Sequence, residues 1–177
     1  ETALILGRWG HTVYYHDAER ILRCHLLPSQ LRDVSSIKEP PNPQNVDGLK
    51  NVADRLRGAF GFPAPYGHKP LENERIRFNL DVVGGTVGSL CEAYREISRS
   101  DQVGHWVNML FDHESPSVKI ESPYTHSSLR VTTKQPGPLF IRIPPWVKPH
   151  EIKIQGVTGN TSIENDYLFI PQPVINP

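Results

Sequence analysis

Cysteine is scarce in this 177-residue chain: Cys24 and Cys91 are the only two, and they lie far apart. They form no C-x-x-C pair, and two cysteines are too few for a structural zinc site or a disulfide framework. An excess of one charge is also lacking, because 19 basic residues balance 19 acidic ones and no block of like charge occurs. From the cysteines we expect no metal site, and from the balanced charge we expect no nucleic-acid partner. We also expect no cofactor.

Long hydrophobic runs are missing as well. No apolar stretch approaches the roughly 20 residues of a membrane-spanning helix, so we expect no membrane partner. The chain begins at Glu1 inside a helical pattern and stops at Pro177 just after an apparent strand. We expect it to be part of a longer protein, whose remainder packs on the helical part and covers its apolar faces.

Helical periodicity dominates the first half of the chain. A tight turn at Trp9-Gly10-His11 joins two predicted helices, and the second ends at Pro28. Thr12 is placed to cap this second helix. Its predicted buried stripe consists of Tyr14, Ala18, Ile21, Leu22 and Leu26. A further helix is predicted after Gly84-Gly85, and its apolar face consists of Val87, Leu90, Cys91, Tyr94 and Ile97.

Residues 33–81 form a long connection between these helices. It is rich in proline, glycine and asparagine, and segments such as 61–67 cannot form a regular helix. A short helical turn is compatible with the pattern from Leu49 to Leu56. A loop of this length inside a compact domain is uncommon and is often functional.

After Ser100 the apolar residues follow a period of two. Turn residues separate short runs, a pattern typical of an antiparallel β-sandwich rather than of βαβ units. Helices followed by strands predict an α+β protein in two parts, residues 1–100 and 101–177. The predicted strands contain Val107 to Phe111, Val118 and Ile120, Leu129 and Val131, Leu139 to Ile143, Ile152 and Ile154, and Leu168 and Ile170.

Several short motifs occur in a characteristic order. They are Tyr15, Asp17, Glu19 and Arg20 on the helix pair, then Val107-Asn108-Met109-Leu110, then Leu139-Phe140-Ile141-Arg142-Ile143-Pro144-Pro145-Trp146. In this order they resemble the C-terminal part of the β-L-arabinofuranosidase family, glycoside hydrolase family 127 and related six-hairpin glycosidases. The resemblance covers about residues 1–167, although the loop over 33–81 matches only in position. It implies the last helices of an (α/α)6 barrel followed by an antiparallel β-sandwich.

The chain departs from the family at one decisive place. Gly84-Gly85 stands where the family has a Cys-Cys pair, one member of which is the zinc-bound nucleophile. A metal keeps such a thiolate deprotonated, and glycine has no comparable chemistry. Cys91 stands where the family has arginine, and the family's glutamates precede Glu1. No catalytic residue is therefore carried over, and we expect that zinc is not required.

The densest polar cluster lies in the long loop, around Glu72 and Glu74. Paired carboxylates serve glycoside hydrolysis, but two residues apart they face one another only in an unusual backbone arrangement. A solvated loop is therefore the more ordinary interpretation. Loop residues near a barrel mouth are still the best candidates for sugar contact. These candidates are His68, Glu72, Arg75 and Asp81 for hydroxyl groups, and Tyr66 or Phe62 for stacking on a ring.

Two further features have simple explanations beside functional ones. The glycines from Gly84 to Gly88 could form a phosphate-binding turn between a strand at 79–83 and a helix, but the spacing is not G-x-G-x-x-G and no P-loop lysine follows. Trp106 and Trp146 fall at strand and strand-end positions. Packing in the core is the ordinary role of tryptophan there, and the alternative is that their rings form a platform on which a sugar stacks.

The sequence thus predicts part of a carbohydrate-active protein, a glycoside hydrolase that acts on glycans. The alternative is a non-catalytic carbohydrate-binding or scaffold protein that kept the same fold.

Overall fold

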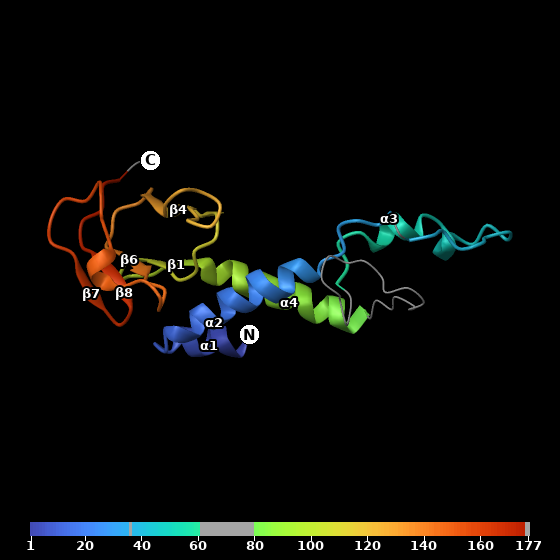
Figure 1. Ribbon diagram of the computed structural model, residues 1–177, viewed down its shortest axis with the longest axis horizontal. Helices are drawn as coiled ribbons and strands as arrows, with labels where there is room; N and C mark the ends of the chain where they lie inside the picture. The colour runs from blue at the N-terminus through green and yellow to red at the C-terminus, as the bar shows by residue number, and fades with distance from the viewer. Residues whose placement is uncertain (36, 61–79, 176–177) are drawn as a thin grey trace. The chain divides into compact units, whose positions relative to one another are not determined.

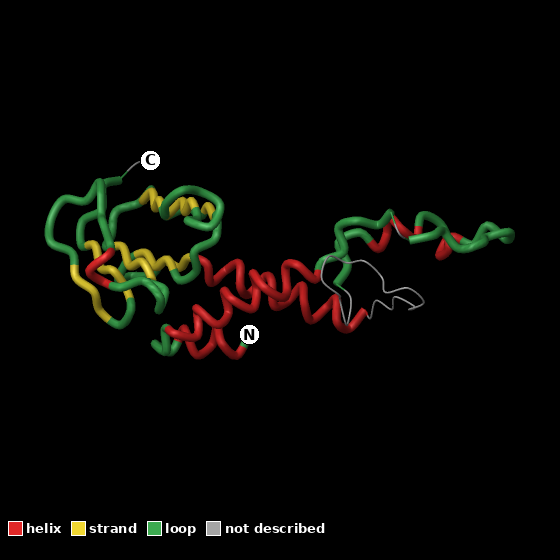
Figure 2. The backbone as a smooth tube through the Cα atoms, viewed as in Figure 1, coloured by secondary structure: helices red, strands yellow, loops and turns green. Residues whose placement is uncertain are grey.

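A computed structural model describes residues 1–35, 37–60 and 80–175, without the side chains of residues 80–84. These residues form both helices and sheets, which confirms a mixed α+β composition (Figure 2). The chain divides into two compact units. The first consists of Glu1–Arg20 and Leu90–Pro177, and the second of Ile21–Ser89.

The helix pair at the start of the chain is confirmed. Helix α1 spans Thr2–Arg8 and α2 spans Val13–Ile21. Gly10 has a φ of 92°, a left-handed conformation that favours glycine, so the turn between the helices can be tight. The helical path continues as a π-helical turn over Leu22–Leu26 and a 3-10 turn over Leu27–Ser29.

The buried face of α2 differs from the predicted stripe. Tyr15, Ala18 and Glu19 are buried, whereas Tyr14 and Ile21 are 37% and 52% exposed. The reason is that Glu19 forms an ion pair with the buried side chain of Arg142. A carboxylate therefore lies on the buried face of α2, where the apolar pattern predicted only hydrophobic side chains.

Helix α4 spans Leu80–Ile97 and therefore begins before Gly84-Gly85. Residues 80–83 are helical, so the interpretation of this region as a strand followed by a phosphate-binding turn is wrong. The predicted apolar face is also wrong in part, because Val87 and Tyr94 are 49% and 59% exposed. Ile97 is buried as predicted, and the other buried side chains among those described in α4 are Thr86, Ala93 and Glu96.

The second unit holds a short 3-10 turn, Asp47–Leu49, and α3, Val52–Leu56, where the sequence allowed a helical turn. The Glu39 carboxylate accepts hydrogen bonds from the backbone N–H groups of Val52 and Ala53, at 2.9 and 3.1 Å. These two groups are among the unpaired donors that every helix start leaves, so Glu39 caps α3.

Two sheets form in the first unit (Figure 1). The five-stranded sheet has the order β1-β2-β6-β8-β7, and the three-stranded sheet has the order β3-β4-β5. Their bounds are β1 Ser98–Ser100, β2 His105–Val107, β3 His113–Glu114, β4 Val118–Glu121, β5 Arg130–Thr133, β6 Leu139–Arg142, β7 Ser162–Glu164 and β8 Tyr167–Ile170.

One strand pair departs from the predicted antiparallel pattern. β2 and β6 pair in parallel, with Trp106 opposite Phe140. The reason is the connection between them, which contains the whole three-stranded sheet and returns the chain in the same direction. The other strand pairs of both sheets are antiparallel.

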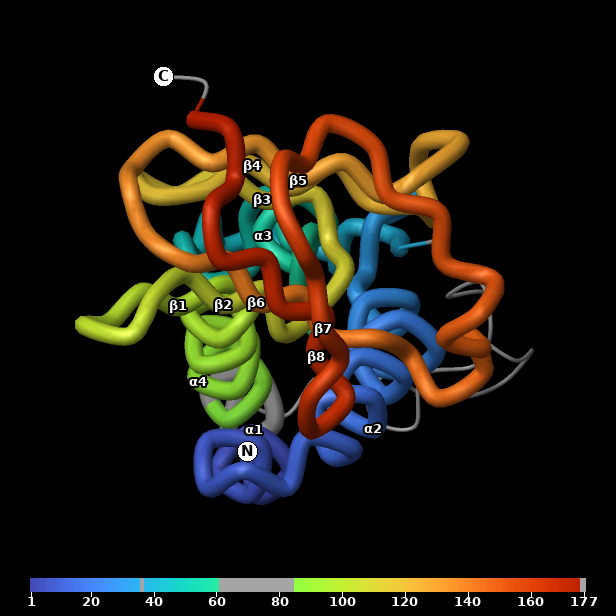
Figure 3. The backbone as a smooth tube through the Cα atoms, turned by 90° about the vertical axis from the view of Figure 1, so that its left-hand side faces the viewer, coloured from blue at the N-terminus to red at the C-terminus, as the bar shows by residue number. Residues whose placement is uncertain are grey.

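The period-two pattern correctly locates β4, β5, β6 and β8. The strand predicted from Val107 to Phe111 overlaps β2 only at Val107, and residues 108–111 form irregular backbone. In β4, Val118 and Ile120 are each 1% exposed while Lys119 between them is exposed. The strand predicted at Ile152 and Ile154 is not formed, because a 3-10 turn over Pro149–Glu151 leads into irregular backbone. Figures 1 and 3 both place the three-stranded sheet over one face of the five-stranded sheet.

Candidate functional site at the junction of helices and sheets

A buried ion pair joins helix α2 to strand β6. The Arg142 guanidinium contacts the Glu19 carboxylate, and their side chains are 2% and 4% exposed. The second oxygen of Glu19 accepts the backbone N–H of Leu110 at 3.2 Å. Arg142 also donates through Nε to the backbone carbonyl of Asn108. Burial lowers the pKa of Arg142, and the adjacent Glu19 carboxylate opposes that shift.

Asn108 lies at the centre of the same polar network and is 1% exposed. Its Nδ2 donates to the Glu96 carbonyl at 3.1 Å, and its Oδ1 accepts from the Tyr167 hydroxyl at 2.6 Å. An asparagine that donates and accepts at once fixes both neighbours, since neither of its amide atoms is left unpaired. It therefore links α4 to β8.

The Glu96 carboxylate extends this network to α1 and α2. One of its oxygens accepts from the Tyr15 hydroxyl at 3.0 Å, and the other pairs with Arg8 Nε at 2.8 Å. Burial, together with the negative charge of Glu96, raises the pKa of Tyr15. Burial and the neighbouring Tyr15 likewise raise the pKa of Tyr167. Both phenols therefore remain protonated donors at neutral pH.

A cavity of about 210 Å³ lies against this network. Three segments surround it: the turn between α1 and α2, the hairpin of β1 and β2, and the turn between β7 and β8. Its lining consists of Gly7, Arg8, Gly10, Thr12, Tyr15, Arg99, Asp101, Trp106, Asn108, Asn165 and Tyr167. Aromatic rings alternate here with hydrogen-bonding groups, a combination that suits a small polar ligand.

Hydrogen bonds hold the walls of this cavity in place. The Thr12 hydroxyl donates to the Asp166 carboxylate at 2.8 Å, and Asn165 Nδ2 donates to the Gly10 carbonyl at 3.3 Å. At the hairpin, burial would raise the pKa of Asp101. The backbone N–H groups of Val103 and Gly104, at 2.8 and 3.1 Å, outweigh that effect and lower it. Asp101 is therefore a carboxylate at neutral pH.

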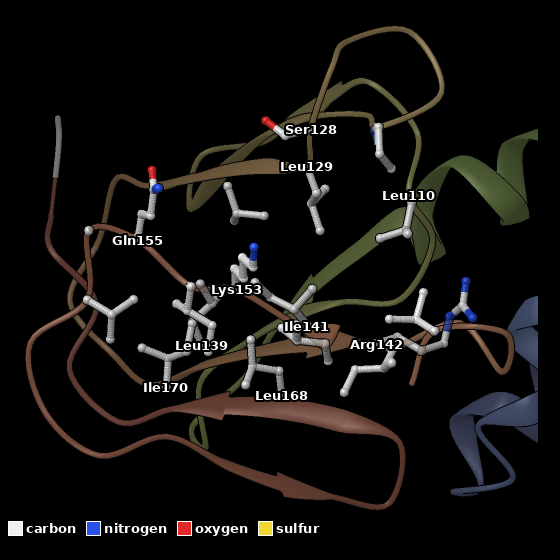
Figure 4. A pocket seen from close by; sticks show the side chains of 18 of the residues that line it. Leu110, Ser128, Leu129, Leu139, Ile141, Arg142, Lys153, Gln155, Leu168 and Ile170 are labelled. Carbon is white, nitrogen blue, oxygen red and sulfur yellow. The ribbon is translucent and has the colours of Figure 1, made fainter. Parts of the chain in front are cut away.

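A second cavity, of about 510 Å³, lies between the two sheets (Figure 4). Leu139 and Ile141 of β6 and Leu168 and Ile170 of β8 line one side, and Leu129 lies opposite. Its walls are mainly apolar, and Ser128, Arg142, Lys153 and Gln155 are among the polar residues that line it. Most of this lining is packing surface of the two sheets and of the loop after β6.

Most of the predicted sugar-contacting residues fall outside the described part of the chain. Tyr66, His68, Glu72 and Arg75 lie in the undescribed range 61–79, so these assignments stay predictions. Asp81 is placed in α4, but its side chain is not described.

The two tryptophans singled out in the sequence have different surroundings. Trp106 stacks on Phe140, with ring centroids 3.9 Å apart, so packing explains one of its faces. Trp146 is 55% exposed and makes a T-shaped contact with His16, with ring centroids 4.8 Å apart. Trp106 is thus a structural residue that also lines the smaller cavity.

The sequence did not predict that Glu19, Asn108 and Arg142 meet in one polar network. Each of them interrupts an apolar pattern and lies in one of the motifs named above, but neither signal indicates which residues contact one another. Within the described residues, no group of three or more His, Cys, Asp and Glu side chains is arranged to hold a metal ion. Cys24 and Cys91 are exposed free thiols. The described helices include none that is both long and apolar enough to cross a membrane.

Comparison of this chain with protein families, with curated proteins and with solved structures finds no match.

Proposed function

We propose that this chain is part of a carbohydrate-active protein, a glycoside hydrolase that acts on glycans. One observation carries the proposal. The three motifs behind the resemblance to the β-L-arabinofuranosidase family contribute Glu19, Asn108 and Arg142, and these residues meet in one buried network. A physical reason for finding these motifs together in one chain is that their residues stabilise one another in the folded protein.

The surrounding structure supports the finer fold assignment in this proposal. Two facing sheets with an apolar space between them suit an antiparallel β-sandwich, apart from the parallel pair of β2 and β6. Ile5 and Val13 are 44% and 52% exposed on the helix pair, which suits helices that pack against further helices of an (α/α)6 barrel. In this arrangement the acid and the nucleophile come from barrel helices outside these residues.

The alternative is a non-catalytic carbohydrate-binding or scaffold protein, and Gly84-Gly85 favours it. These residues lie within helix α4 and carry no side chain that could act as nucleophile. A glycoside hydrolase with this helix would need two carboxylates in place of a zinc-bound thiolate.

A screen of the full-length protein against aryl glycosides and oligosaccharides separates the two functions. Turnover supports the hydrolase, and binding without turnover supports the alternative. The predicted loop contacts are tested in the same assay. Glu72→Gln and His68→Ala should weaken substrate binding about tenfold, whereas Glu164→Gln, on an exposed strand, should not. Absence of both turnover and binding would refute the carbohydrate assignment.

A further inference from the structure

The smaller cavity, against the turn between α1 and α2, has the size of a site for one small ring. Its volume of about 210 Å³ is below the roughly 300–1,000 Å³ of pockets for drug-sized ligands. The polar groups deep in the cavity are already paired: Tyr15 donates to Glu96, and Tyr167 donates to Asn108. The floor is therefore rigid and needs no ligand to hold it.

The open side of the cavity offers hydrogen-bonding groups that are less completely used. The Arg99 side chain is 46% exposed, and its ion pair with Glu96 is long, at 3.9 Å. Asp101 directs one oxygen to the backbone of its own turn. Asn165 uses its amide nitrogen for the Gly10 carbonyl. A guanidinium, a carboxylate and an amide thus surround one small space, which suits a ligand with several hydroxyl groups.

Trp106 contributes an indole N–H to the same space. Its Nε1 is buried and has no well-aligned hydrogen-bond partner among the described residues, but its interaction with Asp101 helps to lower the pKa of that carboxyl group. The donor is therefore only partly satisfied, and buried donors in native proteins are usually fully hydrogen-bonded. An acceptor oxygen on a molecule in the cavity would complete its hydrogen bonding.

The charges of the site favour a neutral ligand. Glu92 pairs with Arg8 and Arg95, and Glu96 pairs with Arg8 and Arg99. With the Asp101 carboxylate included, three anionic groups balance three cationic ones. The aromatic rings of Tyr15, Trp106 and Tyr167 line the same space. We propose that this cavity binds a single neutral sugar ring, with Arg99, Asp101, Asn165 and the Trp106 indole N–H as its polar contacts. This inference rests on the proposed function and places a sugar site at the junction of helices and sheets.

The three tryptophans of the chain provide a direct readout by NMR. Each indole N–H gives its own signal, and Trp9 and Trp146 are 76% and 55% exposed outside this cavity. The 177-residue chain is titrated with glucose, galactose, mannose, xylose and arabinose, and with inorganic phosphate as the anionic probe. We expect a neutral sugar to shift the Trp106 indole signal with saturation, while the Trp9 and Trp146 signals stay in place. Trp106→Phe identifies the signal and keeps an aromatic ring on Phe140.

Variants locate the binding site. Because Trp106→Phe removes the reporter signal, the affinities of the variants are measured by isothermal titration calorimetry. Arg99→Gln and Trp106→Phe should each weaken sugar binding about tenfold, because each removes a hydrogen-bond donor to the ligand. The matched controls Arg130→Gln and Trp146→Phe alter exposed side chains outside the cavity and should bind as the unaltered chain does.

The inference would be overturned if no sugar shifts the Trp106 signal, whether or not phosphate does. It would also be overturned if Arg99→Gln binds sugar as tightly as the unaltered chain. The inference fails alone if the full-length protein still cleaves or binds glycans. It fails together with the proposed function if the full-length protein does neither.

Discussion

Glu19 and Arg142 are 123 residues apart in sequence and form an ion pair that is almost completely buried. The pair ties α2 to β6, and through Leu110 and Asn108 it reaches the segment that follows β2. Taking two charges out of water is costly, so such a pair persists only where further hydrogen bonds complete both partners. Here the backbone of Leu110 and Asn108 supplies them.

Breaking this pair should destabilise the protein strongly. Glu19→Leu or Arg142→Met alone leaves one buried charge without its partner, and each should lower the free energy of unfolding by about 3–5 kcal/mol. The double replacement should cost less than either single one, because it leaves no unpaired charge. Urea denaturation measures all three. Arg130→Ala removes a guanidinium side chain that is 73% exposed from its pair with Glu121, and it should cost less than about 1 kcal/mol. Single replacements as mild as this control would contradict the role of the pair.

His113 should make stability depend on pH below its ordinary pKa of about 6.5. Its ring makes a T-shaped contact with Tyr94, with centroids 4.8 Å apart, and burial lowers its pKa below the ordinary value of 6.5. The unfolded chain therefore binds a proton more readily than the folded chain, so stability falls as the pH drops below about 6.5. His113→Leu should flatten this part of the profile, measured by thermal unfolding. His150→Gln, which alters an exposed ring, should keep the original slope.

Gly104 should not tolerate a side chain. A Cβ atom at this position would lie 2.4 Å from the Pro138 carbonyl oxygen, which also accepts the N–H of His105. Gly104→Ala must displace backbone next to the parallel pair of β2 and β6, and should cost about 1–3 kcal/mol. Gly88→Ala in α4 meets nothing within 4 Å and should be neutral or stabilising by up to about 1 kcal/mol. Equal melting temperatures for the two variants would contradict this packing.

The elements that were predictable from sequence are those with strong local signals. The glycine at position 10 indicates the turn between the first two helices, and its backbone is indeed left-handed. The alternation of Val118, Lys119 and Ile120 indicates strand β4. Local pattern is sufficient there, because the burial of each residue follows from its own element.

The features of the structure that could not be predicted from the sequence depend on residues far apart in the chain. Glu19 is buried because Arg142 meets it, and no local pattern contains that partner. The parallel pairing of β2 and β6 depends on where a long connection returns the chain. The small cavity joins three segments from both ends of the chain, so its residues have no shared sequence signature. The loop contacts at Tyr66 to Arg75 remain predictions.

Zinc removal should leave the function intact. Gly84-Gly85 offers no thiolate, and Cys24 and Cys91 are exposed rather than grouped with other ligands in the described residues. We expect the full-length protein to contain less than one equivalent of zinc by elemental analysis. Treatment with EDTA, and alkylation of both thiols with iodoacetamide, should each leave glycan turnover or binding unchanged. Stoichiometric zinc whose removal abolishes function would refute the expectation.

The most direct test of the central claim is a glycan array probed with the full-length protein. We expect retention on a defined class of glycan, competition by the corresponding free oligosaccharide, and equal retention by the Arg130→Gln control. If no glycan on the array is bound, and none is cleaved in solution by the same folded preparation, the assignment to a carbohydrate-active protein is contradicted.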